Sequence, residues 1–281
     1  PLNYWGTLKG LNNIKDPLRL SLSPYVSSFV QTQNGEATLG YGAGADLKLG
    51  LNESFTLDMT LLPDFSQVRS DNIVKNLGAF EVVFEEQRPF FQEGGDLFNL
   101  GDLFYSRRIG GPPQNRASAY ADLDSNEVVS DNPINSQLLN VAKISGRNKN
   151  GLGIGFMNAL TSSTKALIQD TVSRTIRELE TNPLTNYNIF SFDKNLKNNS
   201  SIYLINLSTL RAGKTMDANV ISAGLNLISK SSKYSMSGNA TLSQRDTNLI
   251  ESLTSFDGGD GLRYSFSVGK IQGNFKYSFS T

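Results

Sequence analysis

The polar and charged side chains of this chain that could do chemistry are concentrated in one stretch, residues 63–110. The stretch contains Asp64, Gln67, Glu81, Glu86, Arg88, Glu93, Arg107 and Arg108. Such a group could form a binding surface or a selectivity constriction inside a pore. It could instead be a set of ion pairs that fills an interior or holds an inward-folded loop, and we favour this interpretation. We expect Arg88 to pair with at least one of Glu81, Glu86 and Glu93.

Most residue types that usually carry catalysis are missing. The 281 residues include no histidine and no cysteine, so the commonest general base, the commonest metal ligand and any thiol nucleophile are absent. Glu85 and Glu86 with Glu93 could suggest a two-carboxylate glycosidase, and Asp257–Asp260 could suggest a calcium site. Neither set has a diagnostic spacing. We therefore expect a protein that is not an enzyme, with no catalytic residue, no metal site and no cofactor.

The overall charge and hydropathy exclude two further classes. Lys+Arg and Asp+Glu each number 26, so the chain lacks the basic excess of a nucleic-acid-binding protein. No apolar run approaches 18 residues, so we expect no transmembrane helix. The mean hydropathy of -0.29 is compatible with a soluble protein or with a transmembrane β-barrel, whose strands alternate apolar and polar residues.

Alternation with a period of two is the dominant pattern along the chain. In residues 55–61, for example, Phe55, Leu57, Met59 and Leu61 alternate with Thr56, Asp58 and Thr60. We expect one face of the resulting sheet to meet lipid and the other to line a lumen. The predicted lipid-facing set is Leu47, Leu57, Ile154, Phe266 and Tyr277, and the predicted lumenal set is Asp46, Asp58, Ser237 and Ser267.

The spacing of the connections favours a barrel. The expected strands are 18–31, 36–51, 54–68, 77–91, 103–110, 137–146, 151–161, 186–193, 200–210, 219–229, 233–244, 261–269 and 273–281. In the second half, short turns alternate with longer connections, which is typical of outer-membrane barrels and not of sandwiches. Near residues 165–180, apolar residues approximate helical spacing and suggest a short helix within a loop. Within 54–110, a segment counted as a strand could instead be an inward-folded plug.

The stretch from Ala45 to Gly110 resembles a family of Bacteroidota-type outer-membrane β-barrel proteins of unassigned function. The motifs that carry the resemblance are Pro63-Asp64-Phe65 with Gln67, Glu86-Gln87-Arg88-Pro89-Phe90-Phe91 with Glu93-Gly94, and Tyr105-Ser106-Arg107-Arg108. Members of that family often carry an N-terminal family-nine-type carbohydrate-binding domain, which has no counterpart in this sequence. The resemblance implies an outer-membrane location and a barrel architecture, but no established reaction.

The sequence therefore predicts an all-β fold, an antiparallel transmembrane β-barrel that is part of a larger barrel. We expect a periplasmic lead-in at 1–17, a barrel domain at 18–281, and long loops at 111–136, 162–185 and 245–260. About 13 strands is an odd number, so we expect further strands after Thr281. The expected role is that of a channel, a transporter or a component of an outer-membrane assembly. The alternative is a barrel that anchors a carbohydrate-binding or carbohydrate-processing domain preceding residue 1. Expected partners are outer-membrane lipid and other outer-membrane or surface proteins, with glycans bound only through such a domain and no nucleic acid.

Overall fold

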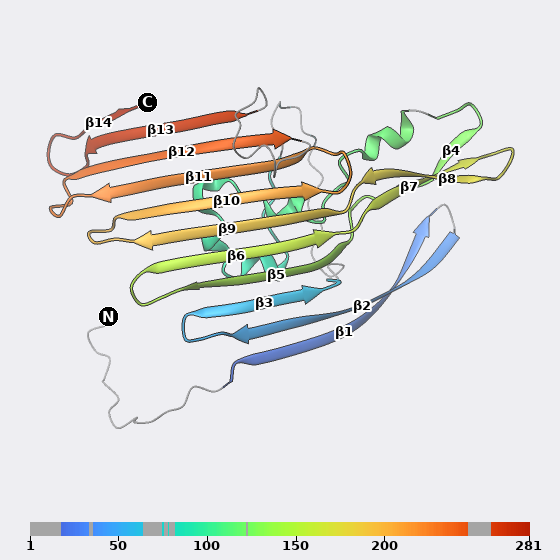
Figure 1. The fold of residues 1–281 in the computed structure, drawn as a ribbon, viewed down its shortest axis with the longest axis horizontal. Helices are drawn as coiled ribbons and strands as arrows, with labels where there is room; N and C mark the ends of the chain where they lie inside the picture. The colour runs from blue at the N-terminus through green and yellow to red at the C-terminus, as the bar shows by residue number, and fades with distance from the viewer. Residues whose placement is uncertain are drawn as a thin grey trace.

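The main part of the structure, a computed structural model, is an eleven-stranded sheet in which every neighbouring pair is antiparallel (Figure 1). The structure describes residues 18–33, 36–63, 75, 78, 82–121, 123–246 and 260–281. In spatial order the strands are β1 (Leu20–Gln33), β2 (Glu36–Gly50), β3 (Phe55–Leu61), β5 (Leu138–Arg147), β6 (Leu152–Thr161), β9 (Thr185–Asn195), β10 (Ser201–Arg211), β11 (Asp217–Ile228), β12 (Tyr234–Asp246), β13 (Gly261–Lys270) and β14 (Tyr277–Ser280). The predicted all-β, antiparallel fold is confirmed.

The two edges of this sheet are β1 and β14, and they are not paired with each other. The sheet is therefore open within the described residues, and its extension by further strands stays a prediction. The predicted lead-in at 1–17 and most of the predicted loop at 245–260 lie outside the described residues.

Short polar turns join the strands along one side of the sheet. In the β5–β6 turn, the Asn148 Oδ1 atom accepts hydrogen bonds from the backbone N–H groups of Asn150 and Leu152, both at 3.0 Å. This turn places Gly151 at a φ of 76°, which glycine adopts without a steric penalty. The connection from β6 to β9 lies along the opposite side of the sheet (Figure 1), so the predicted alternation of short and long connections is confirmed here.

The register divides the strand residues between two faces, because directly paired residues project to the same side of a sheet. Leu47, Leu57, Ile154, Phe266 and Tyr277 share one face, called here the outer face. Asp46, Asp58, Ser237 and Ser267 share the opposite, inner face. The two sets predicted from the alternation therefore lie on opposite faces.

A second, three-stranded sheet extends past the ends of β6 and β9 (Figure 1). It consists of β4 (Glu127–Asp131), β7 (Thr164–Asp170) and β8 (Ile176–Asn182). The helix predicted within 165–180 is therefore wrong, and the loops predicted at 111–136 and 162–185 contain these strands. The Asp170 Oδ1 atom accepts hydrogen bonds from the backbone N–H groups of Val172 and Ser173, which closes a turn where a helix would have to continue. Ala166 and Ile168, two residues apart, are both buried, as on one side of a strand.

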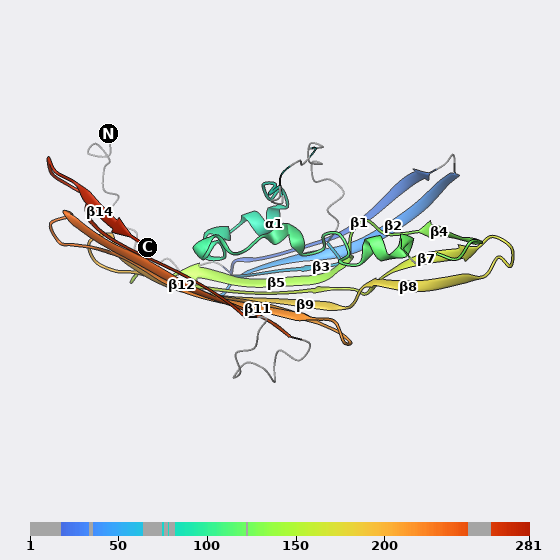
Figure 2. The same cartoon turned by 90° about the horizontal axis from the view of Figure 1, so that it is seen from above.

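Residues 82–121, called here the inner segment, lie on the concave inner face of the sheet (Figure 2). The segment contains the short helix α1 (Pro89–Gln92) and four 3-10 turns, η2 (Gly95–Leu97), η3 (Leu100–Asp102), η4 (Ser106–Arg108) and η5 (Arg116–Tyr120). The strands predicted at 77–91 and 103–110 are wrong over their described residues. Pro89 starts a helix, and Gly94, Gly101 and Gly110 take positive φ values that interrupt a strand. In the described part of the chain, no helix is long and apolar enough to cross a membrane.

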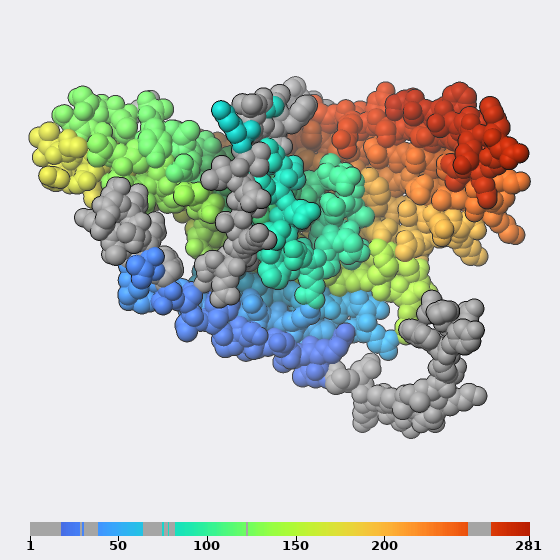
Figure 3. Space-filling model, turned by 180° about the vertical axis from the view of Figure 1, so that it is seen from behind, coloured from blue at the N-terminus to red at the C-terminus, as the bar shows by residue number. Residues whose placement is uncertain are grey.

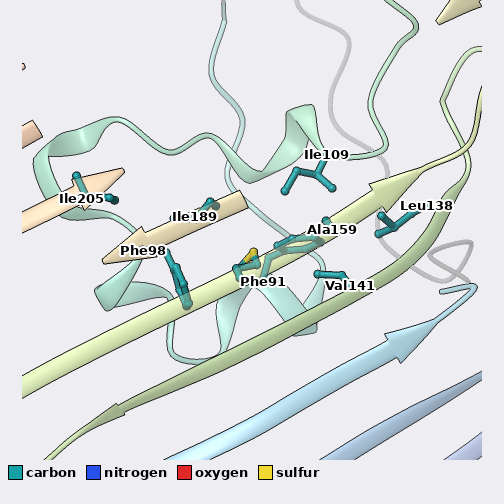
Figure 4. Close-up of a cluster of buried hydrophobic side chains, with 9 residues drawn as sticks. Phe91, Phe98, Ile109, Leu138, Val141, Ala159, Ile189 and Ile205 are labelled. Carbon is teal, nitrogen blue, oxygen red and sulfur yellow. The ribbon is translucent and has the colours of Figure 1, made fainter. Parts of the chain in front are cut away.

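The hydrophobic core joins the inner segment to the sheet (Figure 4). The inner segment contributes Phe91, Phe98 and Ile109, and the chain around the sheet contributes Leu138, Val141, Met157, Ala159, Ile189 and Ile205. Phe98 is only 1% exposed and packs over Gly155, where an added Cβ would lie 3.0 Å from the ring. The inner segment is therefore held by apolar packing as well as by its polar contacts.

Candidate functional site

Glu86 and Arg88 form an ion pair within the inner segment. The Arg88 Nη2 atom lies 2.7 Å from the Glu86 Oε2 atom, and the side chains are 11% and 14% exposed. Ser106 Oγ also donates to Glu86 Oε2 at 2.5 Å, and Arg88 Nη1 donates to the Ile109 carbonyl at 2.7 Å. The guanidinium lies 4.2 Å from the centre of the Phe91 ring. The predicted pairing of Arg88 with at least one of the three glutamates is confirmed for Glu86.

Lys143 on β5 connects the sheet to the end of α1. It is 1% exposed, and its Nζ atom donates to the carbonyl of Phe90 and, at 2.5 Å, to the carbonyl of Glu93. A helix of four residues leaves such carbonyls without donors of its own, and Lys143 supplies one. The Asp58 Oδ2 atom lies 3.9 Å from the ammonium group. The sequence reasoning did not single out Lys143, although the alternation of residues 137–146 could have placed it on the face of Asp58.

The carboxylate of Glu93 pairs with Lys48 on β2 and not with Arg88. The Lys48 Nζ atom also lies 3.8 Å from the Asp58 Oδ1 atom. Two strands of the sheet, β2 and β5, therefore hold the same end of α1 through charged side chains. These contacts separate Glu93 from the Glu86–Arg88 pair, so the predicted charged group consists of at least two distinct clusters.

The remaining residues of the predicted group lie further along the inner segment or outside the described residues. The Arg107 Nη1 atom donates to the Glu85 carbonyl at 3.1 Å. The guanidinium of Arg108 lies 5.9 Å from the centre of the Tyr105 ring, a cation–π contact. Asp64, Gln67 and Glu81 are not among the described residues.

The electrostatics of the two glutamates suit ion pairing. Burial alone would raise the pKa of Glu86, but hydrogen bonds from Arg88 and Ser106 outweigh it and lower the pKa below its usual value. The pKa of Glu93 is lowered mainly by its hydrogen bond with Lys48. A catalytic general acid of a glycosidase needs a raised pKa. The shifts of both glutamates have the opposite direction, which suits groups that stay charged and hold the inner segment in place.

These shifts predict that acid loosens the inner segment. A carboxyl whose pKa is lower in the folded state stabilises it above its unfolded pKa, and the stabilisation is lost as the pH falls through the folded pKa. Below about pH 4.3, we expect the free energy of unfolding of the wild type to decrease as the pH is lowered. Uptake of up to one proton by Glu86 would contribute a slope of at most about 1.4 kcal/mol per pH unit. In Glu86→Gln this contribution should be absent. Denaturant titrations between pH 6 and 3 would test it, and equal pH slopes for both proteins would contradict it.

The fold and site define an antiparallel β-sheet protein whose inner face is partly covered by its own chain. Residues 16–281 match the family described as "Domain of unknown function (DUF5916)", so the chain belongs to this family. Among proteins with curated descriptions, none matches the chain. Among solved structures, it is similar to OmpT, an outer membrane protein of Vibrio cholerae folded in vitro, with 10% identity and a TM-score of 0.28. That similarity covers 96% of this chain and 89% of that chain.

Proposed function

We propose that this chain forms part of the wall of an outer-membrane β-barrel, with the outer face towards lipid and the inner face towards the lumen. In this proposal the protein catalyses no reaction and acts as a channel or transporter whose lumen is narrowed by the inner segment. The observation that carries the proposal is the distribution of apolar and charged side chains between the two faces.

Large apolar side chains project from the outer face of the sheet. Val26 is 84% exposed, Tyr264 69% and Phe279 69%, and Phe156 and Phe190 near the middle of the sheet are each 43% exposed. The same face also carries Asn158 and Asn188, which hydrogen-bond to each other, and Asn206, which donates to Asn219. A soluble monomer rarely leaves so many large apolar side chains on one face uncovered. The hydrocarbon core of a membrane would cover these apolar side chains without removing charged groups from water.

In the described strands of the eleven-stranded sheet, the charged side chains that lie on the outer face are all near the ends of strands. They are Lys194, Asp217, Asp246 and Lys270. Charged residues away from strand ends, including Asp58 and Lys143, lie on the inner face. Charges facing lipid are destabilising near the middle of a bilayer and tolerated near its surfaces, whereas lumenal charges can stay hydrated. The pattern is the one expected of a lipid-facing sheet.

The inner segment would narrow the lumen without covering all of it. Its helical turns contact β6, β9 and β10. Figure 3 views this face and shows the segment across the middle of the sheet, with β12–β14 beside it. The inner face of β12 and β13 presents small polar residues such as Ser237 and Ser267. We therefore assign the passage to the side of the lumen lined by β11–β14.

Fractionation tests the location. The protein should sediment with outer membranes, resist extraction by alkaline carbonate and require detergent for release. Release into the soluble fraction without detergent would exclude the proposal. Conductance across planar bilayers tests the role as a passage. The role would be contradicted if the purified protein, inserted into the bilayer, conducted no ions either as the wild type or as a variant with a loosened inner segment.

A pair of arginine substitutions tests which face meets lipid. Phe266→Arg should lower the free energy of unfolding in lipid by about 2–4 kcal/mol if the position lies near the midplane of the bilayer. Ser267→Arg, one residue along the same strand and on the inner face, is the matched control and should cost much less because it can be hydrated. Denaturant titration of protein folded into vesicles gives both values. Equal costs would show that the faces are assigned wrongly.

A further inference from the structure

A cleft of about 1000 Å³ separates part of the inner segment from the wall. The inner segment contributes Phe84, Arg88 and residues 103–105 and 107–114 to its lining. Strands β9, β10 and β11 contribute inner-face residues that include Tyr187, Thr209 and Val220. The volume lies within the range of small-molecule binding sites. Phe104, Tyr105 and Tyr187 add aromatic surface to the lining. The cleft therefore has the size and the mixed character of a site for a small organic molecule.

The charged side chains that line the cleft, among the described residues, are all arginines. They are Arg88, Arg107, Arg108 and Arg211. Arg88 is neutralised by Glu86 and is a structural residue. Arg211, the last residue of β10, lies on the inner face opposite Thr185 and donates from Nη1 to the Met216 carbonyl at 2.5 Å. That contact uses one edge of its guanidinium, so the group retains donors for a bound oxyanion.

Ser136 supplies a second, independent observation. It lines the same cleft and is only 7% exposed, yet its Oγ atom has no hydrogen-bond partner in the described structure. Buried hydroxyl groups are normally paired, because an unpaired one loses its hydrogen bonds to water without compensation. A ligand in the cleft that offers an acceptor oxygen would satisfy this hydroxyl.

We infer that the cleft binds a small organic anion through a carboxylate or phosphate group. The guanidinium of Arg211 donates to the oxyanion, since a guanidinium fork matches the geometry of both groups. Ser136 precedes β5, three strands away from β10 in the sheet, so its hydroxyl donates to a second acceptor oxygen of the same ligand. The aromatic side chains contact the body of the ligand. This site goes beyond the proposed passage, because it gives the inner side of the wall a preference for anionic solutes.

Binding to the full protein in detergent tests the inference, by isothermal titration with citrate, inorganic phosphate and, as the neutral probe, glucose. Binding of citrate but not phosphate would indicate a site for carboxylates. Binding of phosphate but not citrate would indicate a site for phosphate groups. Either result supports the inference. Arg211→Gln should weaken the binding by roughly 10- to 100-fold, because a charge-assisted hydrogen bond is lost. Arg263→Gln, an arginine on the inner face of β13 outside the cleft, is the matched control and should bind as the wild type does.

Three results would overturn the inference: no binding of either anion, glucose binding as tightly as the anions, or equal loss in Arg211→Gln and Arg263→Gln. If Arg211→Gln does not fold, Ser136→Ala decides. A loss of several-fold in affinity for the anion would support the inference, and unchanged affinity would overturn it. The assay needs no membrane, so its failure would leave the proposed location in the outer membrane intact.

Discussion

Replacing Phe98 with alanine is expected to lower the free energy of unfolding by about 3–5 kcal/mol, the usual cost of removing a buried phenylalanine side chain. Phe98 is 1% exposed and belongs to the core cluster that joins the inner segment to the sheet. Its ring lies against Gly155, so the cavity left by the substitution would open between the segment and the wall. Denaturant titration of the folded protein measures the change.

Tyr120→Ala is the matched control for this substitution. Tyr120 belongs to the same inner segment but is 55% exposed, so its replacement should change the free energy of unfolding by no more than about 0.5 kcal/mol. Limited proteolysis gives an independent measurement, because a loosened inner segment should be cut faster in Phe98→Ala only. If Phe98→Ala is as stable and as resistant to protease as Tyr120→Ala, the inner segment does not depend on this core.

Replacing Lys143 with methionine should cost a similar amount, about 3–5 kcal/mol. Methionine preserves most of the side-chain length but removes the ammonium group. That group lies near the Asp58 carboxylate and donates hydrogen bonds to the carbonyls of Phe90 and Glu93. Removing Lys143 leaves the buried Asp58 carboxylate with Lys48, at 3.8 Å, as its nearby cation and leaves the two carbonyls without this donor. Weaker compensation of a buried charge is the main source of the cost. Denaturant titration at neutral pH would measure it.

Two comparisons isolate the buried pair. Lys149→Met removes a surface ion pair with Glu53, whose side chains are 85% and 61% exposed, and should cost at most about 1 kcal/mol. Adding Asp58→Asn to Lys143→Met removes the buried carboxylate that has lost one of its two cations and should recover part of the loss, giving a measurable coupling between the two sites. If Lys143→Met costs no more than Lys149→Met, Lys143 does not anchor α1.

The strands of the sheet could be predicted from the sequence because their signal is local. In β3 and in residues 262–268 of β13, apolar and polar residues alternate without interruption, and this period alone separates the face of Phe266 from that of Ser267. The β5–β6 turn is likewise determined by a short stretch of sequence, Asn148 to Gly151. The Glu86–Arg88 pair could be predicted for the same reason, since only Gln87 separates the two charged residues.

The inner segment and the second sheet depended on contacts between distant parts of the chain. Val82–Phe91 is rich in residues that favour strands, but burial of Phe91 and Phe98 against β6, β9 and β10 outweighed that local preference. Apolar spacing near 165–180 fitted a helix, yet pairing with β4 favoured the β7–β8 hairpin. Arg177 of β8 forms an ion pair with Glu127 of β4, on the other side of β7.

The same division holds for the candidate sites. Composition by itself removed histidine and cysteine chemistry and left carboxylates, amides and guanidinium groups as the available functional groups. Only the tertiary structure placed Lys143 beneath α1, and only it set Arg211 and Ser136, 75 residues apart in the sequence, along one cleft. Alternation is a property of neighbouring residues, whereas an ion pair or a cleft between distant segments depends on how the sheet curves and what its inner face must bury.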